Sequence, residues 1–282
     1  TENASITIEP ETTLSTNISS LALRSSGVSR KITVTNTGAA NATNIAVSAS
    51  PAWPTGTSVT IAPACSTLAP LASCDVTINP GATPSATPGV TNPTPITMSI
   101  HAENSDTVTA SIHILAYGSV YQSGYIFSFD DSTPITGSVG GVVASLSDQS
   151  TGIVFDAAPR VVGGINEASV AGAGSCDGKS DGLCNTARII AAIGVAYNTY
   201  AAGLCKATIG GYSDWYLPAI CELGYTTASN CGTVGSPFMQ NIQSNLVNNG
   251  NIGSLANNNY YWSSTEYAPN QQNGVWVSNF ST

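Results

Sequence analysis

Apolar and polar residues alternate along most of the first 116 residues. Ile32 and Val34 share one face of "ITVTNTG", and Val76 and Ile78 share one face of "CDVTINP". The same period of two recurs in "NIAVSAS", "SVTIAP", "PITMSI" and "TVTASIHIL", with turn sequences such as "NTGAAN" and "NPGATP" between the runs. Short alternating segments separated by turns are typical of an antiparallel β-sandwich. We therefore expect an all-β sandwich over residues 1–116.

The two histidines of the chain fall within this alternation. His101 follows the apolar positions of "PITMSI", and His113 lies between Ile112 and Ile114. Both side chains are expected on the polar face of a strand, where solvation is the simpler interpretation. A metal pair contributed by opposed strands is the alternative.

From residue 117 onward the pattern changes. "GYIFSF" and "GGVVASLSD" are candidate strands, and residues 185–207 place apolar side chains at helical spacing, with Asn185 or Thr186 as the expected N-cap. A short helix is expected to begin at Pro218, and another at Pro237 after a Ser236 cap. "NNYYWSSTEY" and "GVWVSNF" resemble closing strands. We expect an α+β domain with long loops over residues 117–282.

The stretch "GGYSDWYLP", residues 210–218, concentrates large apolar rings in a chain rich in small polar residues. The paired glycines permit a sharp bend, and Asp214 can fix a turn by accepting backbone hydrogen bonds. Trp215 and Leu217 are expected to be buried beneath the loops. This pattern favours a structural plug over a reactive site.

Charge is scarce in this sequence. Charged residues make up 8% of the chain, against about 25% in an average globular domain. The net charge is -9, with seven Lys and Arg residues in total. So few scattered cations cannot neutralise a row of phosphates, and we therefore expect no nucleic-acid partner. The same scarcity of cations disfavours binding to an anionic membrane. No apolar run approaches the ~20 residues of a membrane helix, so no membrane insertion is expected.

Seven cysteines occur at local spacings and never as CxxC, which argues against a structural zinc site. Disulfides in an oxidising compartment explain them better. The spacing favours the pairs Cys65–Cys74, Cys176–Cys184 and Cys221–Cys231, with Cys205 unpaired or engaged between molecules. A Cys184–Cys205 bond is an alternative. Since the sequence starts at Thr1, we interpret it as an exported, extracellular or cell-surface chain whose signal peptide has been removed.

Two regions resemble known bacterial families. "ITVTNTGAANATNIAVS" and "LAPLASCDVTINPG" resemble the immunoglobulin-like domains that recur in surface proteins, over residues 1–116. "GGVVASLSDQSTGIVF", "GGYSDWYLPAICEL" and "YYWSSTEY" resemble, in the same order, the Lcl-type C-terminal domain, named after a collagen-like adhesin of Legionella. That resemblance covers residues 117–282. It implies a C-type-lectin-like shape whose long loops form one binding surface. The immunoglobulin-like resemblance implies a spacer or interaction module rather than chemistry.

The end of the chain departs from the Lcl-type pattern. Members of that family commonly finish with one further strand, whereas this sequence stops at "VWVSNFST". The resemblance therefore implies a sheet with an open edge, or one that another chain completes. It also leaves Cys205 without the partner that the further strand would supply.

Catalytic and metal-binding motifs are scarce as well. The sequence has no GxSxG, no HExxH and no Walker loop, and both histidines lie outside the second domain. We accordingly expect no enzymatic activity and no cofactor. Asp177 and Asp181, within the Cys176–Cys184 loop, form a weak candidate for calcium.

These features together predict an extracellular structural or adhesive protein that serves as a subunit of a pilus-like fibre. Ile6 and Ile8 alternate in "ASITIEP", a segment that can add as a strand to a neighbouring identical subunit. The alternative is a glycan-binding adhesin head, active as a monomer or trimer and directed at host or surface glycans. Its candidate stacking residues are Tyr212, Tyr216, Tyr260, Tyr261 and Trp276.

Overall fold

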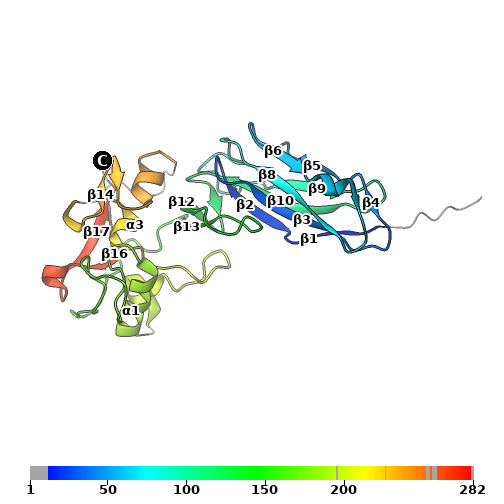
Figure 1. The fold of residues 1–282 in the computed structure, drawn as a ribbon. Coiled ribbons are helices and arrows are strands. Elements are labelled where there is room, and N and C mark those ends of the chain that lie inside the picture. Colours follow the sequence, from blue (N-terminus) through cyan, green and yellow to red (C-terminus); the bar gives the residue numbers. More distant parts are fainter. Residues whose placement is uncertain (1–11, 195, 226, 252–254, 256–258, 281–282) are drawn as a thin grey trace, which may run out of the picture. The chain divides into compact units, whose positions relative to one another are not determined.

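A computed structural model describes residues 12–280 except 195, 226, 252–254 and 256–258. The chain forms two compact units. The first contains the described residues up to Ser119 together with Phe129–Gly140, and the second contains Val120–Ser128 and the residues from Gly141 onward. The chain thus passes between the units three times, near residues 119, 128 and 140. The fold is mostly β-sheet with few helices (Figure 1).

Two four-stranded sheets make up the first unit (Figure 1). Their strand orders are β1-β3-β8-β6 and β2-β10-β9-β5, and β10 pairs with β2 in parallel while the other pairs are antiparallel. The strands of the first sheet are β1 (Leu14–Thr16), β3 (Arg30–Asn36), β8 (Ser73–Asn79) and β6 (Ser58–Ile61). Those of the second are β2 (Ser20–Arg24), β10 (Val108–Leu115), β9 (Ile96–His101) and β5 (Ala46–Ser50). A small extra pair consists of β4 (Ala42–Thr43) and β7 (Thr67–Leu68).

The alternation seen in the sequence builds the core between these sheets. Alternate residues of β3 are buried, among them Ile32 and Val34, and they meet Ile112 and Ile114 of β10 in one apolar cluster. His113 lies between the last two, on the other face, where it is half-buried. Burial lowers the pKa of His113 below its usual value. Two sheets whose inner faces meet in one apolar core form a sandwich.

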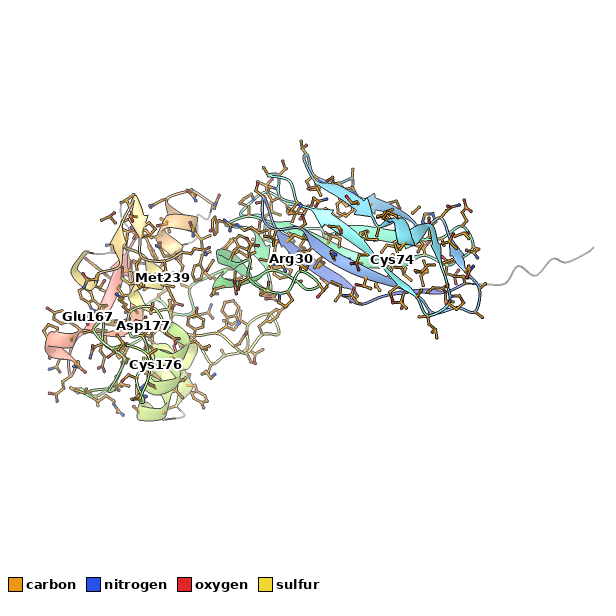
Figure 2. The ribbon with its side chains drawn as sticks, viewed as in Figure 1. Arg30, Cys74, Glu167, Cys176, Asp177 and Met239 are labelled. Carbon is orange, nitrogen blue, oxygen red and sulfur yellow. A yellow bond between two sulfur atoms is a disulfide. The ribbon has the colours of Figure 1, made fainter. Side chains whose placement is uncertain are left out.

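Residues 129–140 belong to the first unit because a buried arginine holds them there. The side chain of Arg30 is fully buried. Its Nη1 donates to the carbonyl oxygens of Pro134 (3.0 Å) and Gly137 (2.8 Å), and its Nη2 donates to Oγ1 of Thr133 (3.0 Å). Figure 2 labels Arg30 on the ribbon of β3. No local sequence pattern indicates this loop, since its partner lies about a hundred residues away.

The second unit combines small sheets with short helices (Figure 1). Its sheets have the orders β11-β12-β13, β14-β15 and β16-β17. The strands are β11 (Val120–Tyr121), β12 (Gly124–Asp130), β13 (Gly140–Ser145), β14 (Gly232–Thr233), β15 (Ser236–Pro237), β16 (Tyr260–Glu266) and β17 (Val275–Asn279). The last two residues of β12 and the first residue of β13 fall within the first unit. The helices are α1 (Gly182–Ile193), α2 (Ala201–Leu204), α3 (Ile220–Leu223) and a π-type turn at Gln243–Val247. Single 3₁₀ turns occupy Tyr197–Thr199, Thr227–Ser229 and Ala268–Asn270 in this unit, and Pro63–Ser66 in the first unit.

Helix boundaries in the second unit differ from those expected. Helix α1 begins at Gly182, and its N-cap is Asp181, whose carboxylate accepts from the N–H of Cys184, rather than Asn185 or Thr186. The next residue after the helix is Gly194, where a φ of 101° excludes a continuous helix to residue 207. Helix α3 begins at Ile220 rather than at Pro218, because the carbonyl of Pro218 accepts from Ser264 of β16.

The helix expected from Pro237 is also wrong. Ser236 and Pro237 form β15, which pairs with β14 across a tight turn. The Cys221–Cys231 disulfide anchors the chain just before that hairpin, and Phe238 donates to the carbonyl of Cys231. Helical backbone starts only at Ile242. The disulfide and the hairpin thus hold Ser236 and Pro237 in a strand, although the local sequence favours a helix.

Three disulfides join Cys65 to Cys74, Cys176 to Cys184 and Cys221 to Cys231. These are the pairs that the spacing favours, and the alternative Cys184–Cys205 bond is not formed. Cys205 is a free thiol. Disulfides of this kind are typical of an oxidising environment, extracellular or periplasmic. In the part of the chain that the structure describes, no helix is long and apolar enough to cross a membrane.

Candidate functional site

A groove of about 570 Å³ lies within the second unit. One wall consists of Gly141–Ser145 of β13, and the other includes Tyr260–Trp262 of β16. We call it the strand-edge groove. All of its lining residues belong to the second unit.

The groove borders an edge of β13 rather than one of its faces. Successive side chains of a strand point to opposite faces, so a pocket on one face touches every second residue. Here five consecutive residues, Gly141 to Ser145, line the groove. Among the described strands, β13 is the last of its sheet and pairs only with β12. Its outer edge therefore faces the groove.

The opposite wall is formed in the same way by β16. Tyr260, Tyr261 and Trp262 are consecutive lining residues, and β17 is the strand neighbour of β16 in the described sheet. Further along β16 the edge is covered, because the N–H of Ser264 donates to the carbonyl of Pro218 (2.8 Å). The groove thus ends where the loop before α3 reaches β16.

Apolar side chains form the floor. Phe127 of β12, Leu223 of α3, Ile242 and Phe280 are buried in one cluster, and all of them line the groove. Val142, Ala144 and Leu255 pack partly buried against the same cluster. The groove therefore opens directly onto a hydrophobic core, an arrangement that favours an apolar or partly apolar occupant.

Aromatic rings line the groove as well. Of the predicted stacking residues, Tyr212, Tyr216, Tyr260 and Tyr261 are brought together there. Tyr260 is 71% exposed and Tyr212 is 37% exposed, so both rings can be reached from solvent. Trp276 is not part of this set. It packs against the cluster of Ile220, Cys221 and Cys231, and its ring meets Tyr267 edge-on.

Trp215, which is expected from the sequence to be buried, and Trp262 are also lining residues. Trp215 is half-buried, not buried as expected, and its Nε1 donates to the carbonyl of Ile209 (3.3 Å). Nε1 of Trp262 donates to the carbonyl of Ile153 (2.8 Å). Leu217, by contrast, is buried, as expected. "GGYSDWYLP" is therefore both a structural plug and part of the wall of the groove.

A buried carboxylate positions the ring of Tyr216. Oε1 of Glu222 accepts from the Tyr216 hydroxyl (2.8 Å), and Oε2 accepts from the N–H groups of Ala219 (2.7 Å) and Gly182 (3.2 Å). One side chain thus joins the groove wall to the first turns of α1 and α3. Burial raises the pKa of Glu222 to about 7, although these hydrogen bonds oppose the change. Burial beside this carboxylate also raises the pKa of Tyr216.

The free thiol lies at the groove too. Cys205 follows α2, lines the groove, and places its Sγ 3.6 Å from the carbonyl oxygen of Ala201. Burial raises the pKa of Cys205 to about 12, so the thiol is neutral at physiological pH. A neutral, buried thiol is a poor nucleophile, and it adds to the apolar surface of the groove.

Charge at the groove is sparse and acidic. Among the described lining residues, the charged side chains are those of Asp148 and Asp214, and both are exposed. Oδ2 of Asp148 accepts from the Tyr261 hydroxyl at 3.3 Å. No lysine, arginine or histidine is among these lining residues. This wall composition disfavours a polyanionic ligand such as a sulfated glycan.

The calcium candidate lies elsewhere, in the Cys176–Cys184 loop (Figure 2). Asp181 uses its carboxylate as the N-cap of α1, and the carbonyl of Asp177 accepts from the N–H of Asp181 (2.8 Å). In the described ranges no group of three or more His, Cys, Asp or Glu side chains is placed to hold a metal ion. Calcium binding at Asp177 and Asp181 stays a prediction.

Comparison with known proteins gives little further guidance. No family model and no curated protein matches the chain. One solved structure that it matches is a secreted serine protease, VesC from Vibrio cholerae, at 21% identity and a TM-score of 0.26, over 39% of this chain and 24% of the protease. Another is a GH5 xyloglucanase of Bacteroides ovatus, in complex with a XXXG heptasaccharide, at 14% identity and a TM-score of 0.25, over 59% of this chain and 29% of that enzyme. The chain thus spans less than a third of either matched protein.

These matches correct one expectation. Because a matched structure is that of a serine protease, the prediction that the protein has no enzymatic activity is contradicted, and we withdraw it. At a TM-score of 0.26 the likeness assigns no protease activity to this chain either.

Proposed function

We propose that the protein is an extracellular structural and adhesive subunit, and that its strand-edge groove binds an extended polypeptide segment of another subunit. The observation that carries this proposal is the run of five consecutive β13 residues along the groove. A strand edge offers a row of backbone donors and acceptors, and an added strand satisfies them. The apolar floor supplies pockets for alternate side chains of the added strand.

The composition of the chain agrees with this role. Low charge and three disulfides suit a protein that works outside the cytoplasm. The immunoglobulin-like character inferred for the first unit and the Lcl-type, lectin-like character inferred for the second are part of the same proposal. Modules of these kinds serve in surface proteins as spacers and as binding heads.

Assembly of the purified chain tests the proposal. Sedimentation velocity and negative-stain electron microscopy of native material should show oligomers or regular fibres that grow with protein concentration. The test variant is Ala144→Trp, which places a large ring in the groove, and its matched control is Thr109→Trp on the exposed face of β10. The groove variant should lower the assembled fraction at least tenfold, and the control should not. A monomer at all concentrations would contradict the proposal.

A second candidate function is glycan binding. The observation that favours it is the set of aromatic rings along the groove, where the polar atoms of Trp215, Tyr216 and Trp262 are held by hydrogen bonds. Neutral sugars stack on such rings, and the acidic wall disfavours sulfated ones. A glycan array with the wild-type chain and with Tyr260→Ala separates the two candidates. Hits that disappear in the variant would support glycan binding, and an array without hits would remove it.

A further inference from the structure

We propose that the occupant of the strand-edge groove is residues 4–10 of a second copy of this chain. This inference rests on the proposed function and names its partner. Residues 4–10, Ile6 and Ile8 among them, lie outside the described residues.

The lengths of donor and acceptor agree. Five residues of β13 border the groove, and a strand rises about 3.3 Å per residue, so the open edge spans roughly 17 Å. The donor sequence "ASITI", residues 4–8, has the same number of residues and carries no charge. Pro10 lacks a backbone N–H and cannot extend the ladder, so pairing ends beside it.

The side-chain pattern of the donor fits the floor. Ala4, Ile6 and Ile8 point to one face of an extended segment, and Ser5 and Thr7 point to the other. Placed with the apolar face downward, the isoleucines contact the buried cluster that contains Phe127, Leu223 and Ile242. A shift of one residue would direct Ser5 and Thr7 onto that apolar surface, so the register is fixed by the floor.

Charge also constrains the register. The acidic groups of the groove, Asp148 and Asp214, repel carboxylates. Glu2 and Glu9 flank the neutral run of the donor on either side. A register centred on residues 4–8 keeps both glutamates beyond the five-residue edge. Assembly is therefore expected to strengthen as salt screens the remaining repulsion between acidic groups.

Complementation between two full-length variants tests the inference. A donor variant, Ile6→Asp/Ile8→Asp, keeps its groove, and an acceptor variant, Ala144→Trp, keeps its donor segment. Each alone should remain monomeric, because each lacks one half of the contact. When they are mixed, native mass spectrometry should show a 1:1 complex and nothing larger, since only one productive contact is possible. Thr7→Asp, on the opposite face of the donor, is the matched control and should weaken assembly far less than the double variant.

The outcomes separate this inference from the proposed function. If the wild-type chain assembles and Ile6→Asp/Ile8→Asp assembles equally well, the donor is another segment and the inference fails while the proposed function stands. If the wild-type chain does not assemble, both fail. Val142→Trp is a second acceptor variant, used if the circular dichroism of Ala144→Trp shows loss of the fold. A monomeric mixture of folded donor and acceptor variants would overturn the inference.

Discussion

The two units of this chain are stabilised in different ways. The first has one apolar core between two four-stranded sheets, with alternate residues of every long strand buried. The second distributes its apolar residues over several smaller clusters. It adds two of the three disulfides and a set of buried polar groups, among them Glu222, Thr265 and Glu266. A regular core leaves little surface unfilled, whereas small clusters joined by polar contacts leave room for a groove.

The largest loss of stability is expected from a substitution in the core of the first unit. Ile112→Ala removes a fully buried side chain of β10 and leaves a cavity, at an expected cost of about 2–5 kcal/mol. Thr109→Ala on the same strand is exposed and should change stability by about 0.5 kcal/mol or less. Differential scanning calorimetry should show that Ile112→Ala destabilises one unfolding transition only, that of the first unit. Equal losses in both variants would contradict the account of a single apolar core.

Removal of a disulfide should destabilise the second unit more than the first. Cys221→Ala/Cys231→Ala opens the loop between α3 and β14, and loss of such a disulfide costs about 2–4 kcal/mol. Cys65→Ala/Cys74→Ala is the matched change in the first unit, where the large core should keep the sandwich folded. The measurement is the melting temperature of each transition. If loss of the Cys65–Cys74 bond lowered the melting temperature of the sandwich more than loss of the Cys221–Cys231 bond lowered that of the second unit, this prediction would be contradicted.

The two units should respond to pH with opposite signs. Burial raises the pKa of Glu222 and Glu266 from 4.5 to about 7, so the folded second unit holds protons that the unfolded chain releases. Its stability should therefore fall as pH rises from about 4.5 to about 7, by up to about 1.4 kcal/mol per pH unit for each glutamate. The pKa of His113 is lowered from 6.5, so the first unit should lose stability as pH falls below 6.5.

Chemical denaturation at a series of pH values checks these slopes. Glu222→Gln and Glu266→Gln should each flatten the slope of the second unit, because neither amide titrates. His113→Asn should flatten that of the first. A second-unit slope that persists in the Glu222→Gln/Glu266→Gln double variant would contradict the assignment of the titrating groups.

The smallest loss of stability is expected from the removal of an ion pair on the surface of the first unit. Nζ of Lys31 lies 3.1 Å from Oδ2 of Asp75, and both side chains are 37% exposed. Exposed ion pairs contribute about 0–1 kcal/mol, so Asp75→Asn should lower the free energy of unfolding by that amount. The effect should decrease further in high salt. A loss above about 2 kcal/mol in urea denaturation would show that this pair matters far more than its exposure suggests.

The contrast between the regular core of the first unit and the contacts between distant chain segments explains how much of the fold the sequence could predict. Residues such as Ile32, Val34 and Ile112 follow a period of two, and that local signal is enough to assign strands and a sandwich core. The contacts that Arg30 makes with residues 133–137 depend on chain segments far apart in the sequence, and no local pattern contains them. The expected N-caps of α1, Asn185 and Thr186, were wrong for a different reason: the helix begins before the apolar periodicity, and Asp181 caps it.

The groove was only partly foreseeable. Four tyrosines suggested as stacking residues meet there, because large aromatic side chains stand out in a sequence dominated by small polar residues. Its β13 wall was not foreseeable, since "GGVVASLSD" predicts a strand but not which of its edges is left without a strand neighbour. Edge exposure is decided by the whole sheet, and the position of Cys205 at the groove likewise depends on how α2 packs.

The most direct test of the central claim is a density map of the assembled protein. Cryo-electron microscopy of fibres or oligomers should show an extra strand beside Gly141–Ser145, paired with β13 and contributed by a neighbouring molecule. Its side-chain density should alternate large and small, with the large groups above Phe127 and Leu223. An assembly in which the groove is empty, with subunits joined through other surfaces, would contradict the account.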